Sequence, residues 1–132
     1  MTIFGLPQGT PLSQMKACVG TPQPLNLTTL VAGSTQNSLI MPTDFCIVTT
    51  SDAANKSLTL PDPNKYGGTP GDSFFVAAGQ VGTTLTIFPP TGGAIDAAGA
   101  NNSVNITAGT TAAFILQAFT ATTSTWIGDS GS

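Results

Sequence analysis

Hydrophobic and polar residues alternate in short runs along most of the chain after residue 44. The clearest run is 83–88, in which Leu85 and Ile87 alternate with threonines before Pro89 and Pro90 end the ladder. A period of two is that of a β-strand whose two faces meet different surroundings. Similar runs, rich in β-branched or aromatic residues, predict further strands at 45–50, 57–60, 73–77, 103–107, 112–119 and 125–127.

The segments between these runs are turn sequences that carry Gly, Pro, Asn and Asp. These residues supply a fixed or positive φ, and their frequency interrupts any helix of useful length. Short strands at a spacing of about 8–12 residues are typical of a sandwich, barrel or roll. We therefore predict an all-β domain of short antiparallel strands over residues 25–132.

The first 24 residues differ from the rest of the chain. Pro7, Pro11, Pro22 and Pro24 exclude both a helix and a central strand. The segment nevertheless carries more apolar side chains than a solvated linker needs. We expect residues 1–24 to form an extended arm that packs either on another protein or on its own β domain. The candidate docking residues are Ile3, Phe4, Leu6, Leu12 and Met15.

Few side chains of this chain could support catalysis. It has no His, Glu or Arg, and its titratable groups are six Asp, three Lys, one Tyr and two Cys. General acid–base catalysis draws mainly on His and on tuned carboxylates, and the Asp residues lie mostly in turn sequences, where they bind backbone amides. We therefore expect no enzymatic activity, no metal site and no cofactor.

The low charge also restricts the partners. Charged residues make up 7% of the chain, the net charge is −3, and the three lysines are isolated, which argues against nucleic acid. No apolar stretch is long enough to span a bilayer, and the N-terminus lacks the pattern of a secretion signal, so synthesis in a cytoplasm is expected.

Apolar residues, at 40% of the chain, exceed what one small domain readily hides, which favours self-association. We expect the following residues in the core or at the interface between copies: Phe74, Leu85, Ile87, Val104, Ile106, Phe114, Leu116 and Trp126. Cys18 and Cys46 have two interpretations: a disulfide, or two buried thiols, which the cytoplasmic origin favours.

The order of parts from residue 45 to residue 129 resembles the small β domains of bacteriophage virion proteins, such as fibre and capsid-decoration modules. The resemblance is one of pattern and covers about two thirds of the chain. It includes a strand before an Asp-Ala turn, Gly-rich turns, a Thr-x-Thr-Ile-Phe strand and a terminal Trp-Ile. The corresponding pieces are 49–54, 58–61, 67–71, 74–77, 82–88, 92–96, 104–106, 108–109, 113–119 and 125–127.

The resemblance implies a homotrimeric structural protein on the exterior of a virion. The absence of a heptad repeat and the Pro-rich arm favour a capsid decoration (cement) protein over a fibre. Such a protein binds the major capsid protein, bridges neighbouring capsid subunits and stabilises the shell. The alternative is a receptor-binding or glycan-binding module of a phage fibre or spike, which would use Tyr66 and Trp126.

Overall fold

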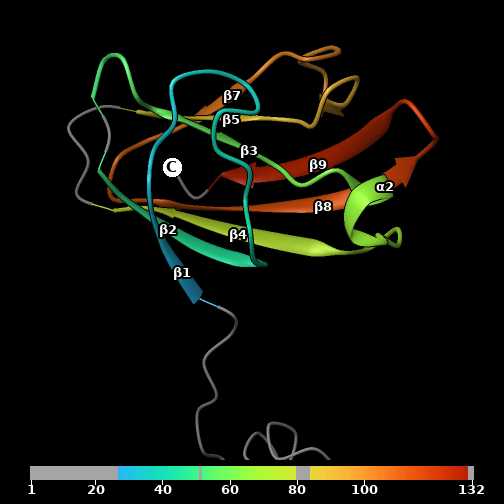
Figure 1. Ribbon diagram of the computed structural model, residues 1–132, viewed down its shortest axis with the longest axis horizontal. Coiled ribbons are helices and arrows are strands. Elements are labelled where there is room, and N and C mark those ends of the chain that lie inside the picture. Colours follow the sequence, from blue (N-terminus) through green and yellow to red (C-terminus); the bar gives the residue numbers. More distant parts are fainter. Residues whose placement is uncertain (1–26, 51, 80–83, 131–132) are drawn as a thin grey trace, which may run out of the picture.

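The computed structural model describes residues 27–50, 52–79 and 84–130 of the chain, and the predicted arm over residues 1–24 lies outside them. The strands form two sheets that pack face to face (Figure 1). The six-stranded sheet has the order β1-β2-β4-β8-β9-β6, and the three-stranded sheet has the order β3-β5-β7. The strands are β1 (Leu27–Val31), β2 (Phe45–Thr50), β3 (Ser57–Thr59), β4 (Ser73–Ala78), β5 (Leu85–Phe88), β6 (Ala94–Ile95), β7 (Val104–Ile106), β8 (Thr111–Phe119) and β9 (Ser124–Ser130).

The prediction of an all-β protein is confirmed, but the prediction of antiparallel strands holds for only three of the seven described strand pairs. Four pairs are parallel: β1 with β2, β2 with β4, β3 with β5, and β6 with β9. The antiparallel pairs are β4 with β8, β5 with β7, and β8 with β9. Both sheets are therefore mixed.

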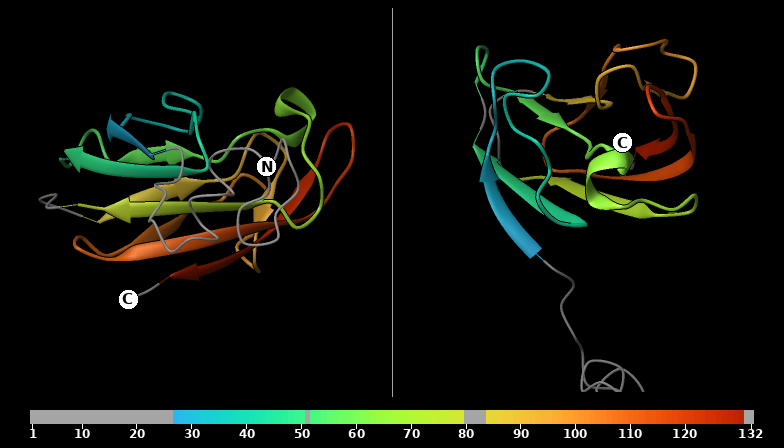
Figure 2. Two further views of the ribbon diagram at one scale, coloured as in Figure 1. Left: turned by 90° about the horizontal axis from the view of Figure 1, so that it is seen from below. Right: turned by 45° about the vertical axis from the view of Figure 1, so that its right-hand side comes forward.

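The cause is the path of the chain between the two sheets. From β2 to β7, each strand lies in the opposite sheet from the one before it, as the two further views show (Figure 2). A chain that leaves a sheet and returns to it has crossed the molecule, so its next strand can run in the original direction. The turn sequences predicted only that the chain changes direction. Among the described strands, β8 and β9 are the only consecutive pair that forms an antiparallel hairpin.

The core lies between the two sheets: β4 and β8 of the six-stranded sheet contribute alternate residues, whereas β3 and β5 of the three-stranded sheet are buried at successive positions. In β4, Phe74, Val76 and Ala78 are buried, and in β8 the buried residues are Ala112, Phe114 and Leu116. The three-stranded sheet supplies its own fully buried side chains, Leu58, Leu85 and Ile87 among them. Trp126 is 1% exposed, and its indole N–H donates to the Ser124 hydroxyl at 2.9 Å.

Two strands and one helical turn were not predicted from the sequence. β1 lies at one edge of the six-stranded sheet, and the two-residue β6 lies at the other. The helical turn α2 (Pro63–Tyr66) begins at Asp62, whose side chain accepts a hydrogen bond from the Asn64 amide at 2.9 Å. It ends at Gly67, which has a φ of 77°. Asp62 therefore caps a helix, a role that Asp commonly takes.

The burial pattern generates a prediction about stability. Ile87→Ala and Leu116→Ala should each lower the free energy of unfolding by about 2–5 kcal/mol, because each truncation leaves a cavity between the sheets. Ile40→Ala is the matched control, since Ile40 is 45% exposed, and it should cost less than about 1 kcal/mol. Urea unfolding followed by circular dichroism measures all three. Equal effects at Ile40 and Ile87 would contradict the assignment of the core.

Candidate functional site

The six-stranded sheet presents an apolar surface on the side away from the core. Because β2, β4, β8 and β9 alternate, their other residues point outward, and many of these are also apolar. Phe75, Ile115 and Ile127 are 39%, 40% and 46% exposed. We call this surface the outer face, and it consists of Phe45, Ile47, Phe75, Ala77, Ala113, Ile115 and Ile127.

The register of the strands makes the outer face continuous. Phe45 lies opposite Phe75, and Phe75 lies opposite Ala113. Ile115 lies opposite Ile127 in the next pair of strands. The rings of Phe45 and Phe75 have centroids 6.2 Å apart, within the range of favourable aromatic pairs. The described outward side chains of β2, β4 and β8 include no charged residue, so the surface has the character of an interface.

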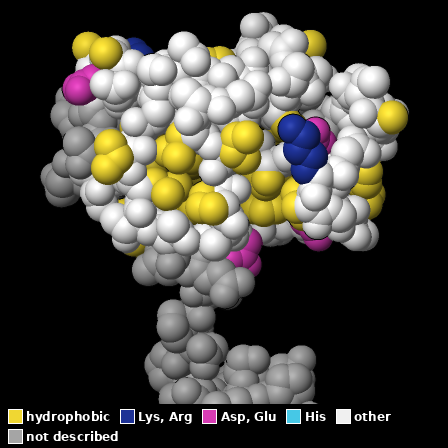
Figure 3. All heavy atoms as spheres, in the orientation of Figure 1, with side chains coloured by type: hydrophobic (Ala, Val, Ile, Leu, Met, Phe, Trp, Pro, Cys, Tyr) yellow, Lys and Arg dark blue, Asp and Glu magenta, His cyan; other side chains and the backbone are white. Residues whose placement is uncertain are grey.

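A second surface feature is a groove at the edge of the sandwich that faces the viewer in Figure 3, where hydrophobic side chains gather beside a lysine. Two cavities of about 430 Å³ and 480 Å³ form it. They share Met41, Pro61 and Tyr66, so they adjoin, and we call them together the edge groove. Backbone bonds from Met41 to Thr59 and from Thr59 to Leu39 hold one wall of the groove against β3.

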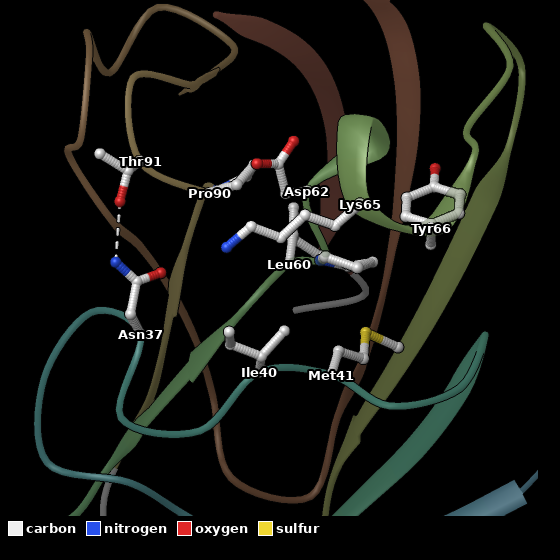
Figure 4. Close-up of a pocket in the computed structure, with 10 residues that line it drawn as sticks. Asn37, Ile40, Met41, Leu60, Asp62, Lys65, Tyr66, Pro90 and Thr91 are labelled. Carbon is white, nitrogen blue, oxygen red and sulfur yellow. Dashed lines mark hydrogen bonds between the residues drawn. The ribbon is translucent and has the colours of Figure 1, made fainter. Parts of the chain in front are cut away.

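Polar groups border the edge groove. Lys65 extends over the first cavity between Asp62 and Ile40, and Tyr66 lies on the far side (Figure 4). Asn37 donates to the Thr91 hydroxyl at 2.8 Å and fixes the opposite rim. In the second cavity, Asp44 has a buried carboxylate oxygen, Oδ1, with no hydrogen-bond partner among the described groups.

Tyr66 connects the groove to the core. Its ring packs edge-on against Phe74 at 5.6 Å, and Phe74 packs against Trp126 at 5.7 Å. Its hydroxyl donates to Asp72 Oδ2 at 3.1 Å. Burial disfavours the phenolate, and the hydrogen bond and negative charge of Asp72 add to this effect, so the pKa of Tyr66 is raised well above its usual value of 10.

The carboxylates mainly stabilise turns. Asp52 Oδ1 accepts from the amides of Ala54 and Asn55, and these bonds lower the pKa of Asp52. Asp72 accepts from the Thr69 amide at 2.8 Å. In the described part of the chain, no three His, Cys, Asp or Glu residues lie close enough to hold a metal ion. Cys46 is a buried free thiol, and Cys18 lies outside the described residues.

The structure places the predicted interface or core residues inside the protomer. Phe74, Leu85, Ile87, Ile106, Phe114, Leu116 and Trp126 are buried, and Val104 is partly buried against them. The arm residues Ile3, Phe4, Leu6, Leu12 and Met15 lie outside the described residues. The sequence reasoning missed the outer face. The sequence does contain a sign of the outer face in the adjacent apolar pairs Phe74-Phe75 and Phe114-Ile115. Because neighbouring residues in a strand point to opposite faces, each pair places one apolar side chain on either side of the sheet.

Comparisons of the chain with protein-family models, with curated proteins and with solved structures found no match. Within the described ranges, no helix combines the length and the hydropathy that crossing a bilayer would require. The outer face and the edge groove are the two candidate functional surfaces in the described part of the chain.

The environment of Tyr66 can be tested directly, because Tyr66 is the only tyrosine in the chain. The phenolate absorbance of the folded protein should appear well above pH 10, whereas the urea-unfolded chain should titrate near 10. Since folding raises the pKa of Tyr66, the contribution of Tyr66 to the free energy of unfolding is fully present below pH 10. That contribution is lost as the pH rises toward the pKa of the folded protein. Asp72→Asn should bring the folded pKa closer to 10. An unchanged titration in Asp72→Asn would contradict the role of Asp72.

Proposed function

We propose that this protein is a structural virion protein without enzymatic activity, which decorates and stabilises a phage capsid as a homotrimer. The observation that carries the proposal is the outer face, a continuous apolar surface on the larger of the two sheets. Contiguous exposed apolar patches of a few hundred Å² on soluble proteins are often functional, and many of them are sites of association. In the proposed trimer, the outer face lies at the contacts between copies.

The scarcity of charge supports a permanent assembly. Contacts between apolar and neutral polar groups are insensitive to salt, whereas surface ion pairs weaken as the ionic strength rises. If each protomer offers one modest contact to the major capsid protein, linking three of them strengthens overall binding by about 10²–10⁴. The trimer then acts as a multivalent clamp across neighbouring capsid subunits.

The first test of this function is an assembly experiment on the full-length protein. Light scattering should give three times the 13.3 kDa protomer mass. Ile115→Lys should dissociate the trimer, because it places a charge in an apolar contact, and co-sedimentation with purified shells should weaken by about 10²–10⁴-fold. Ile40→Lys, at a site of similar exposure in the edge groove, should leave the mass unchanged. A monodisperse wild-type monomer at micromolar concentration would overturn the proposal.

The edge groove favours a second candidate function, a receptor-binding or glycan-binding module of a phage fibre. An aromatic ring beside carboxylate and amide groups suits a sugar, whose faces are apolar and whose hydroxyls form hydrogen bonds. Tyr66 is 40% exposed, and Asp62, Lys65 and Asn37 line the same cavity. This arrangement is the specific observation on which the alternative depends.

The two functions are separable at Tyr66. If the groove binds a glycan, Tyr66→Ala should reduce the affinity for host-surface polysaccharide by about tenfold or more, because the substitution removes one well-packed aromatic contact. If the decoration function is correct, Tyr66→Ala should leave trimer mass and shell binding unchanged. Calorimetry with the polysaccharide and co-sedimentation with shells measure the two outcomes. Tyr66→Phe serves as the control that keeps the ring and removes only its bond to Asp72.

A further inference from the structure

We infer that the N-terminal segment of one copy, residues 1–26, covers the outer face of the six-stranded sheet in a neighbouring copy. The inference deepens the proposed function, because it rests on self-association and names what occupies the apolar surface. Three observations carry it: the chemistry of the two surfaces, the point at which the described chain begins, and the size of the outer face.

The outer face and the N-terminal segment match in chemistry. The face presents Phe, Ile and Ala side chains, and the described outward side chains of its central strands are uncharged. Lys16 is the single charged residue among the first 43 of the chain. Apolar side chains such as Ile3, Phe4 and Leu6 gain by leaving water for such a surface, by about 25 cal/mol for each Å² buried. Apart from Lys16 in the segment and Asp129, whose backbone lies opposite Ala113 at the β9 border of the face, neither side contributes a charged residue to this contact.

The described chain begins beside this surface. Leu27 pairs with Phe45, and Phe45 pairs with Phe75 at the centre of the outer face. From β2 to β9 the face spans three strand spacings, roughly 14 Å at about 4.8 Å each. An extended chain covers that distance in about five residues. The segment from Ile3 to Leu12 is therefore long enough to cross the whole face.

The reach of the chain before β1 favours a neighbouring copy over the same one. Pro22 and Pro24 restrict their own φ and force Thr21 and Gln23 toward extended backbone. At about 3.1 Å per residue, six residues with extended backbone would reach roughly 19 Å from the start of β1. That length exceeds the width of the chain's own outer face. A contact from each copy to the next closes into a ring of three when successive copies are related by a rotation of about 120°.

The size of the face argues against direct packing of one sheet on another. Its footprint, about 14 Å by 13 Å plus side-chain margins, is on the order of 300 Å². A stable interface usually buries about 800 Å² on each partner. A segment of 26 residues that wraps over the face and past its borders supplies the missing area, as extended segments that order on binding commonly do.

The experiment uses full-length protein in which p-benzoylphenylalanine, a photo-reactive residue, replaces Phe75. The matched control carries it at Tyr66, an aromatic residue of nearly equal exposure, 40% against 39%, in the edge groove. Mixing ¹⁴N-labelled and ¹⁵N-labelled copies before irradiation distinguishes cross-links between chains from those within one chain. We expect position 75 to join peptides of residues 1–24 from another copy, with several-fold lower yield from position 66. Phe4→Ser combined with Leu6→Ser should reduce the yield at position 75 several-fold.

Each other outcome overturns the inference. Cross-links from position 75 to residues 1–24 of the same chain would show that the segment covers its own sheet. Cross-links to β-strands of another copy would show direct packing of sheets, and a lack of cross-links at position 75 would show an uncovered face. If light scattering still gives a trimer in these cases, the proposed function stands while the inference fails. A monomer would contradict both the proposed function and the inference.

Discussion

The structure depends on one constraint: a single three-stranded sheet can cover only one face of a six-stranded sheet. β3, β5 and β7 bury the inward residues of the larger sheet, among them Val76, Phe114 and Trp126. The central strands, however, carry apolar residues at both inward and outward positions. Sheets with two apolar faces are normally covered on both sides. The outer face therefore follows from the topology, and in the proposed assembly a neighbouring copy covers it.

The sequence predicted the strands better than their arrangement. Runs rich in β-branched and aromatic residues at 45–50 and 73–77 identified β2 and β4 to within a residue, because this composition is a local property of the chain. Strand direction is not local. Leu58 pairs in parallel with Ile87, which lies 29 residues later, only because β4 lies in the other sheet between them. Nothing in a turn sequence records which sheet the next strand will join.

The candidate site was less predictable than the fold. Tyr66 was singled out only as a lone aromatic residue, and its bond to Asp72 depends on the helical turn α2 and on the loop that follows it. The outward position of Phe75 follows from its neighbour Phe74, but choosing which of the two points inward requires the register with β2 and β8. A shift of one residue would exchange the two faces. The sequence therefore contained two apolar faces without showing which of them the small sheet covers.

Neutral side chains, together with the carboxylates of Asp62 and Asp72, hold the loops around the groove. Asn101 Oδ1 accepts from the Gly92 amide at 2.8 Å and from Gln36 Nε2 at 3.3 Å. Asn64 Nδ2 donates to the Thr120 carbonyl at 2.8 Å and ties α2 to the β8–β9 hairpin. Such bonds do not titrate near neutral pH and are not screened by salt. The same preference for neutral polar side chains therefore gives these loops hydrogen bonds that persist across ionic conditions. That property suits a protein whose proposed role is to hold surfaces together.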